Sequence, residues 1–277
     1  MSFIEAILFG IFQGFTEIFP ISSSGHLAIL GNLFGISSDM YNFQMLTVFL
    51  HFGTLLSILF VYYPEFYEMV SEIITVSRAS RGEVRGKTRY PSVRLLIMMI
   101  ITCIPSVFLF PLMKYIDNLY YSSYFIGIML IFSGIILFIS DKLDDGGKDE
   151  RNMTFFDALI IGFCQLVASI PGISRIGLDM TAGKAVGLSK EFSLKYAYLL
   201  SVPAVFGMNI VHLVEAASLG FLWKDVPLYL VGMVVSMLTG TLAMRIVRSA
   251  AEKGYFHDFA YYCWIAGVLF VILTMIF

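Results

Sequence analysis

The stretch Phe19-Pro20-Ile21-Ser22-Ser23-Ser24-Gly25 interrupts an apolar segment near the start of the chain, and Ile170-Pro171-Gly172-Ile173-Ser174-Arg175 interrupts a second one. Proline restricts the residue before it and serine favours the N-cap position, so one helix should end and another begin at each interruption. Each half-helix is too short to cross a bilayer comfortably. The segments 2–35 and 154–187 are therefore predicted to be re-entrant helical hairpins with tips at membrane depth.

The composition of the chain is that of a membrane protein. Of its 277 residues, 58% are hydrophobic and only 14% are charged, and the mean hydropathy is +0.83. A soluble domain could not bury so much apolar surface. Six further apolar stretches can each cross a hydrocarbon core of ~30 Å: 43–63, 95–115, 121–140, 192–215, 226–247 and 256–277. The net charge of −2 gives no sign of a nucleic-acid partner.

The two interrupted segments belong to an internal repeat. Residues 6–37 align without a gap on residues 158–189, and the identical pairs include Gln13 with Gln165, Ser22 with Ser174 and Gly25 with Gly177. Most identities are Gly, Ser and Gln rather than the Leu, Ile and Val that chance would match in an apolar chain.

Each repeat, 1–140 and 154–277, is thus predicted to contain one re-entrant hairpin and three transmembrane helices. A hairpin returns to its own side and three crossings then reverse the direction, so the two repeats should be inverted. The expected fold is a single all-α integral membrane domain over residues 1–277.

The basic residues predict the orientation. In this topology 15 of the 18 Lys and Arg residues fall on one side, which the positive-inside rule assigns to the cytoplasm. They are Arg78, Arg81, Arg85, Lys87, Arg89, Arg94, Lys142, Lys148, Arg151, Lys184, Lys190, Lys195, Arg245, Arg248 and Lys253. We expect a multi-pass protein of the cell (plasma) membrane whose first hairpin opens to the extracytoplasmic side.

Ionisable residues at membrane depth point to the working site. An intramembrane charge costs roughly 2.5 to 3.5 kcal/mol on insertion scales, so it needs a function or a partner. The candidates are Glu17, His26, His51, Arg175 and Asp179. The second half-helix of each hairpin starts with free N–H groups and a positive dipole end, which bind anions, and an arginine fork suits phosphate oxygens.

These residue types predict phosphoryl transfer. Ser23 is a candidate nucleophile, and His26 lies on the same helix face three residues later. Glu17 either orients His26 or, with Gln13, coordinates a divalent cation, Mg²⁺ or Ca²⁺. Catalytic roles are therefore predicted for Glu17, Ser23, His26 and Arg175. Substrate-binding roles are predicted for Ser22, Ser24, Gly25, Gly172, Ser174 and Asp179.

Several of these residues also have simpler interpretations. Serines that follow a proline are commonly helix caps. Two interpretations of Ser23 therefore stay open: a nucleophile and a helix cap. His51 is interpreted as a core histidine with satisfied hydrogen bonds. Asp179 lies one helical turn after Arg175, where it could serve only to neutralise the guanidinium.

The motifs resemble those of a known family. Gln13 and Glu17 followed by Pro20-Ile21-Ser22-Ser23-Ser24-Gly25-His26 match the family pattern (E/Q)xxxE and PxSSSGH, and Pro171 to Asp179 matches PGxSRSxxT. The sequence thus resembles the undecaprenyl-pyrophosphate phosphatases of the bacitracin-resistance type over nearly its whole length. Two positions depart from the second motif: Ile176 stands in place of the usual Ser, and Asp179 in place of the usual Thr.

The resemblance implies hydrolysis of a polyprenyl diphosphate to the monophosphate, with a divalent cation, in recycling of a lipid carrier for the cell envelope. The implied partners are the diphosphate lipid and the bilayer, and a homodimer is left open. Two other hypotheses also stay open. One is a transporter or flippase of polyprenyl phosphate lipids, because inverted repeats with broken helices are transporter architecture. The other is a lipid-binding protein that has lost catalysis through Ile176 and Asp179.

Overall fold

The computed structural model describes residues 1–34, 40–78, 90–112, 119, 122–218, 223–253 and 255–276. Within these ranges the chain forms eleven α-helices, two 3-10 segments and no β-sheet. The α-helices are α1 (Phe3–Ile18), α2 (Ser23–Leu33), α3 (Met40–Val61), α4 (Tyr63–Arg78), α5 (Pro91–Cys103), α7 (Ser123–Lys142), α8 (Phe155–Val167), α9 (Arg175–Ala185), α10 (Lys190–Ser218), α11 (Val226–Lys253) and α12 (Phe256–Ile276), and the 3-10 segments are η2 (Ile104–Leu112) and η3 (Trp223–Asp225). The all-α prediction is confirmed.

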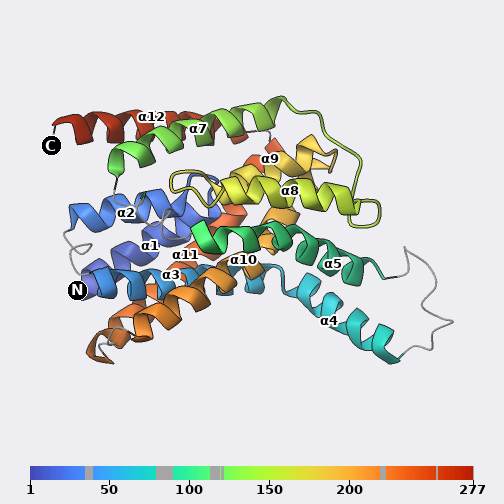
Figure 1. Ribbon diagram of the computed structural model, residues 1–277, viewed down its shortest axis with the longest axis horizontal. Helices are drawn as coiled ribbons and strands as arrows, with labels where there is room; N and C mark the ends of the chain where they lie inside the picture. Colours follow the sequence, from blue (N-terminus) through green and yellow to red (C-terminus); the bar gives the residue numbers. More distant parts are fainter. Residues whose placement is uncertain are drawn as a thin grey trace.

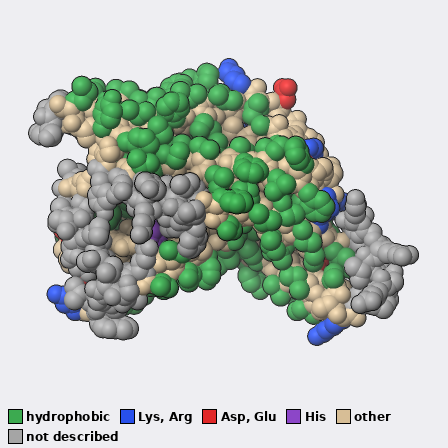
Figure 2. All heavy atoms as spheres, in the orientation of Figure 1, with side chains coloured by type: hydrophobic (Ala, Val, Ile, Leu, Met, Phe, Trp, Pro, Cys, Tyr) green, Lys and Arg blue, Asp and Glu red, His purple; other side chains and the backbone are tan. Residues whose placement is uncertain are grey.

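Six helical segments in the described residues are long and apolar enough to cross a membrane. They are Phe43–Val61, Pro91–Phe108, Ser123–Lys142, Lys190–Val214, Val226–Lys253 and Phe256–Met275. Each coincides with one of the six predicted crossings. Hydrophobic side chains cover most of the described surface in Figure 2, while Lys and Arg lie at its edges. That distribution is expected where the middle of a protein meets hydrocarbon.

The two predicted helix breaks are present. Residues 19–22 separate α1 from α2, and residues 168–174 separate α8 from α9; we call these the first tip and the second tip. The four helices have 16, 11, 13 and 11 residues, so none reaches the ~20 residues that a span needs. Both α1 and α8 start with a capping box, at Ser2 and Thr154, which fixes where each helix enters.

Two segments differ from the expected spans and loops. The first long loop was predicted to follow α3 directly, but residues 63–78 form α4. This helix is amphipathic: Met69 is buried in a cluster with residues of α5, and Glu65 pairs with Lys195 at 3.2 Å. The next crossing is α-helical only to Cys103 and then tightens into η2. Pro105 explains the change, because it has no N–H to continue the α-helical hydrogen bonding.

Close helix pairs hold both hairpins in the bundle. α1 packs along α11, and α8 packs along α5 (Figure 1). A Cβ at Gly10 of α1 would lie 2.7 Å from the carbonyl oxygen of Gly232, and a Cβ at Gly162 of α8 would collide with the carbonyl oxygen of Thr102. Larger residues would push these helices apart, which is the use of small residues in membrane packing.

The two tips meet near the middle of the molecule. A Cβ at Gly25, in the first turn of α2, would lie 3.4 Å from Cα of Gly172 in the second tip. In the reverse direction, a Cβ at Gly177 of α9 would lie 3.4 Å from Cβ of Pro20 in the first tip. The irregular backbone of each tip is therefore covered by the other, as irregular backbone at membrane depth requires.

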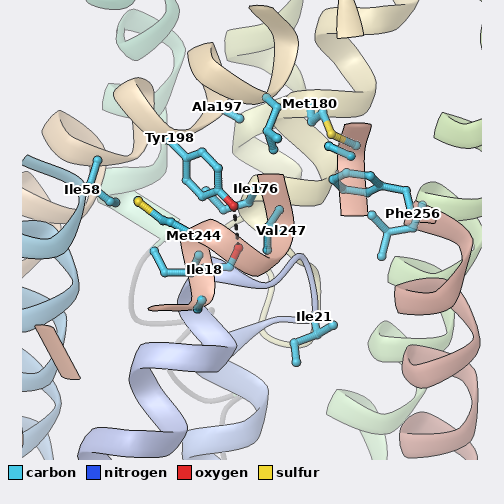
Figure 3. Close-up of a cluster of buried hydrophobic side chains, with 14 of the residues drawn as sticks. Ile18, Ile21, Ile58, Ile176, Met180, Ala197, Tyr198, Met244, Val247 and Phe256 are labelled. Carbon is cyan, nitrogen blue, oxygen red and sulfur yellow. Dashed lines mark hydrogen bonds between the residues drawn. The ribbon is translucent and has the colours of Figure 1, made fainter. Parts of the chain in front are cut away.

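A hydrophobic cluster supports both tips from one side (Figure 3). Ile18 and Ile21 enter it from the first hairpin, and Ile176 and Met180 enter it from α9. The hydroxyl of Tyr198, on α10, donates a hydrogen bond of 2.9 Å to the carbonyl of Ile18. That carbonyl is one of those left free where α1 ends, so Tyr198 completes the end of the helix.

Lys148 closes the open end of the second hairpin. Its ammonium group donates to both carboxylate oxygens of Asp157 at 2.9 Å and to the carbonyl of Val186 at 2.8 Å. Its backbone pairs with the carbonyl of Gly187 and the N–H of Ser189. The start of α8 and the end of α9 are thus linked through one residue of the preceding loop.

This link should make stability depend on pH. Burial raises the pKa of Asp157, but hydrogen bonds from Lys148 and Thr154 outweigh burial and hold the pKa below its usual value. A lowered carboxylate pKa stabilises the fold above the unfolded value of about 3.9, and that contribution is lost as the pH falls further. We expect the thermal midpoint in detergent to fall below pH 4. Asp157→Asn should have a lower midpoint at neutral pH and lose less of it on acidification. Equal pH profiles for parent and variant would contradict this role.

Candidate active site

The first tip leaves the start of α2 open. Ser22, the residue before α2, has φ of +67° and makes no side-chain cap to the helix; its Oγ lies 3.4 Å from Oγ of Ser24. A positive φ on a residue other than glycine is strained and occurs often at functional sites. The first N–H groups of α2 therefore keep their capacity to bind an anion.

The second tip is closed by its own side chains. Ser174 caps α9 by accepting a hydrogen bond of 3.1 Å from the N–H of Gly177. Ser133 of α7 donates to the carbonyl of Gly172 at 3.1 Å and accepts from the N–H of Ser174 at 2.7 Å. Gly172 has φ of +96°, which glycine adopts without strain. The two equivalent tips thus differ: only the first lacks a side-chain cap.

Glu17 is the centre of the polar residues at the first tip. The hydroxyl of Ser23 donates to its Oε2 in a short hydrogen bond, and the amide of Gln13 donates to the same oxygen at 3.2 Å. Nε2 of His51, on α3, lies 3.4 Å from that oxygen as well. The side chain of Glu17 is only 9% exposed, so these three groups provide most of its solvation. The nucleophile candidate therefore has a carboxylate as its immediate base.

His51 belongs to this cluster and is not an isolated core histidine. Its Nδ1 lies 2.8 Å from the carbonyl of Thr47, and because a carbonyl only accepts, Nδ1 carries a proton. Its Nε2 lies 3.4 Å from Oε2 of Glu17. The ring is thus held at Nδ1 and turned toward the carboxylate. This pairing was not predicted from the sequence, in which His51 is one more polar residue in an apolar span.

His26 lies apart from Glu17, although it follows Ser23 by three residues. Its Nδ1 is 2.8 Å from the carbonyl of Ser22. Its Nε2 is 2.8 Å from the hydroxyl of Tyr262 on α12, and the two rings are stacked with centroids 5.7 Å apart. The expected orientation of His26 by Glu17 is absent among the described contacts, and His51 takes that place beside Glu17.

Arg175 interacts electrostatically with two carboxylates. It begins α9 and acts electrostatically on Glu17 of the first hairpin and on Asp179 of its own helix. Its guanidinium makes no hydrogen bond within the described residues. Asp179 is 1% exposed, and neither of its oxygens has a hydrogen-bond partner in the described part of the chain. Ile176, the other departure from the motif, is buried in the hydrophobic cluster behind the tips.

The residues Gln13 and Glu17 fit a divalent cation. Gln13 is fully buried, and its Oε1 has no hydrogen-bond partner among the described residues. The described residues contain no group of three or more His, Cys, Asp or Glu side chains that could hold a metal. An amide oxygen beside one carboxylate suits a hard cation such as Mg²⁺, which commonly takes one or two protein ligands and completes its shell with water and substrate phosphates.

Replacing His51 tests its contact with Glu17. His51→Leu should leave the buried carboxylate of Glu17 without this partner, at a cost of about 3 kcal/mol in unfolding free energy. Glu17→Gln in the same chain should recover most of that loss, because no buried carboxylate then lacks its partner. Unfolding of the parent, both single variants and the double variant in detergent measures the coupling. Simple additivity of the two losses would show that the residues do not interact.

Comparison with known proteins identifies the family. Residues 6–269 match the model of the family described as bacitracin resistance protein BacA. Among curated relatives, the undecaprenyl-diphosphatase of Halothermothrix orenii is 35% identical and that of Alkaliphilus metalliredigens is 33% identical, both with complete coverage of the two chains. The undecaprenyl-diphosphatase of Methanococcus maripaludis is 34% identical over 98% of this chain and 100% of its own. The chain therefore belongs to the bacitracin resistance protein BacA family.

Proposed function

We propose that the chain is an integral membrane phosphatase that hydrolyses a polyprenyl diphosphate of the undecaprenyl type to the monophosphate and inorganic phosphate. The name of its relatives, undecaprenyl-diphosphatase, supports the substrate class. One observation carries the proposal: the hydroxyl of Ser23 is hydrogen-bonded to Glu17 at the start of an uncapped helix. A nucleophile, its base and an anion site thus coincide. The monophosphate would return as a lipid carrier for cell-envelope synthesis.

The diphosphate is proposed to bind between the two tips. The open N-terminus of α2 supplies N–H groups to the terminal phosphate, and Arg175 supplies a planar fork for its oxygens. The contact between the tips at Gly25 and Gly172 supports a single ligand touching both. Binding roles for Ser22, Ser24, Ser174 and Asp179 stay predictions. Asp179 would limit the excess positive charge that Arg175 brings to membrane depth.

The proposed chemistry proceeds in two displacements. Ser23 passes its proton to Glu17 as its oxygen bonds to the terminal phosphorus, and the bond from that phosphorus to the bridging oxygen breaks to release the lipid monophosphate. Water then hydrolyses the phosphoserine, which regenerates Ser23 and releases phosphate. His51 lies beside Glu17 and favours the carboxylate form that accepts the proton of Ser23 in the first step. His26 is proposed to take up and return a proton through Nε2, because its Nδ1 is bonded to Ser22.

A divalent cation, Mg²⁺ or Ca²⁺, is proposed to bind at Oε1 of Gln13 and the carboxylate of Glu17. When bound, it would neutralise charge that develops on the phosphate oxygens. The protein's part is to hold these two ligands: Gln13 is anchored by its own amide hydrogen bond to Glu17. The repeat provides a comparison, since Gln165 of the second hairpin is also buried with an unpartnered Oε1 but is not next to a Glu17 equivalent.

Two features of the architecture are likewise proposed. The pairing of α1 with α11 and of α8 with α5, each through an equivalent glycine, supports two related repeats with opposite orientation. Lys148 binds Asp157 at the start of α8, and in Figure 1 the start of α8 lies at the opposite end of the bundle from both termini. This supports a cytoplasmic lysine-rich end and a site open to the extracytoplasmic side. A homodimer stays a prediction that light scattering in detergent would test.

A lipid transporter is the second candidate. The observation in its favour is the contact between two broken helices from different halves of the chain, the arrangement in which transporters bind substrates. Vesicles would separate the candidates: movement of a polyprenyl monophosphate across the bilayer that persists in Ser23→Ala would favour transport. Binding of a diphosphate with no turnover in any divalent metal would instead favour a lipid-binding protein.

Phosphate release from farnesyl or longer diphosphates tests the phosphatase proposal. Arg175→Ala should reduce turnover by about 10² to 10³-fold, since it removes the charge that stabilises the transferring phosphoryl group. Ser23→Ala should lower it by more than about 10³-fold. The measurement is inorganic phosphate released by purified protein in detergent with added Mg²⁺ or Ca²⁺.

Arg248→Ala is the matched control for the arginine variant. Arg248 is exposed, with 72% of its side chain accessible, and pairs only with Glu252 one turn later. This variant should release phosphate at the parent rate. If Arg175→Ala and Ser23→Ala also kept the parent rate, the proposed site would be wrong.

A further inference from the structure

Two histidines of the chain have the same hydrogen bond at Nδ1 and different partners at Nε2. In both His26 and His51, Nδ1 lies 2.8 Å from the carbonyl four residues earlier, so this nitrogen is the donor in each ring. Nε2 of His51 faces a carboxylate, whereas Nε2 of His26 faces the phenol of Tyr262. Each ring is therefore held at Nδ1 in the same way, and the partner at Nε2 distinguishes the two histidines.

The surroundings of His26 favour the neutral ring. It is only 6% exposed and forms no ion pair within the described residues. Its ring stacks on Tyr262 and meets the edge of Phe270 at 6.0 Å, so α12 covers it with aromatic groups. A buried imidazolium without a counter-ion would be costly. With Nδ1 protonated and the ring neutral, Nε2 is an acceptor, and the hydroxyl of Tyr262 donates to it.

We infer that Tyr262 is a positioning residue: the carbonyl of Ser22 leaves Nε2 of His26 as the unprotonated nitrogen, and the hydroxyl of Tyr262 orients this nitrogen and keeps it ready to accept a proton. The inference rests on the proposed function at one point, the proton transfer proposed for His26. Three contacts fix the ring: the carbonyl of Ser22, the hydroxyl of Tyr262 and the stacked aromatic face. The same arrangement ties α12 to Ser22, whose positive φ opens the start of α2.

The position of Tyr262 agrees with this role. The residue is 43% exposed, and it lies on a helix that is apolar enough to span a membrane. A phenol hydroxyl that faces hydrocarbon needs a partner inside the protein, and Nε2 of His26 is the one the structure gives it. The neighbouring Tyr261 is equally exposed, at 47%, but its ring contacts are with His257 and Trp264. Only one tyrosine of the adjacent pair reaches the first tip.

Tyr262→Phe separates the effect of the Tyr262 hydroxyl from that of its ring. Tyr262→Phe keeps the stacked ring and removes only the donor, so the fold and the KM for a farnesyl or longer diphosphate should stay within about twofold of the parent. Turnover should fall on the order of 10- to 100-fold, the usual effect of removing the group that orients a functional histidine. Tyr261→Phe is the matched control and should keep the parent turnover.

Nitrogen-15 NMR of histidine-labelled protein reads the tautomer directly. The chain has four histidines, so His26→Gln and His51→Gln assign the two rings by difference. We expect a neutral His26 ring with the proton on Nδ1 and a hydrogen-bonded Nε2 in the parent and in Tyr261→Phe. In Tyr262→Phe the proton should stay on Nδ1, because the carbonyl of Ser22 is unchanged, while the resonance of Nε2 should shift toward that of an imidazole nitrogen without a hydrogen bond. The resonances of His51 should stay unchanged and serve as an internal reference.

The outcomes distinguish this inference from the proposed function. Unchanged turnover or an unchanged Nε2 resonance of His26 in Tyr262→Phe would overturn the role of Tyr262. If His26→Gln kept the parent turnover, the proton-carrying role of His26 would fail, and the NMR comparison would still decide whether Tyr262 donates to Nε2. A shifted Nε2 resonance together with slower turnover in Tyr262→Phe alone supports the inference.

Discussion

A broken helix exposes backbone groups that need partners within the protein, and the rest of the structure depends on how this chain covers two such breaks. Each tip lies against the other, as the contacts of Gly25 with Gly172 and of Gly177 with Pro20 show. The hydroxyl of Tyr198 donates a hydrogen bond to the last carbonyl of α1, and the hydroxyl of Ser133 donates one to the carbonyl of Gly172 in the second tip. One short segment of each hairpin is thereby fixed inside the bundle.

The two tips differ in how their second helix begins, and the candidate site lies at the tip that lacks a side-chain cap. Ser174 caps α9, so the second tip is complete by itself. The first tip has no equivalent cap. Ser23 begins its second helix and binds Glu17, and Arg175 of the second hairpin interacts electrostatically with Glu17. The equivalent glycines and glutamines of the repeat maintain the packing. The charged residues of the two hairpins are not equivalent: Glu17 belongs to the first, and Arg175 and Asp179 belong to the second. We therefore assign the chemistry to the first tip and charge compensation to the second.

Local sequence patterns predicted much of the fold. The Pro and Ser residues of the tips predicted both helix breaks, and apolar length predicted six crossings. The amphipathic α4 was missed, because its hydropathy is that of a loop, and so was the tightening into η2 at Pro105. Glu17, Ser23 and Arg175 were selected from types and spacing. His51 was listed but interpreted as a core histidine, and Tyr262 was not selected, since their contacts with Glu17 and His26 span 34 and 236 residues of sequence and depend on tertiary packing.

The central claim is that one diphosphate is held by both tips. A structure of the protein with a non-hydrolysable polyprenyl methylenediphosphonate tests it most directly. The account predicts that the terminal phosphonate contacts the first N–H groups of α2 and the guanidinium of Arg175 together, with the hydroxyl of Ser23 facing its phosphorus. A headgroup bound away from α2, or one bound there with Arg175 directed elsewhere, would contradict it.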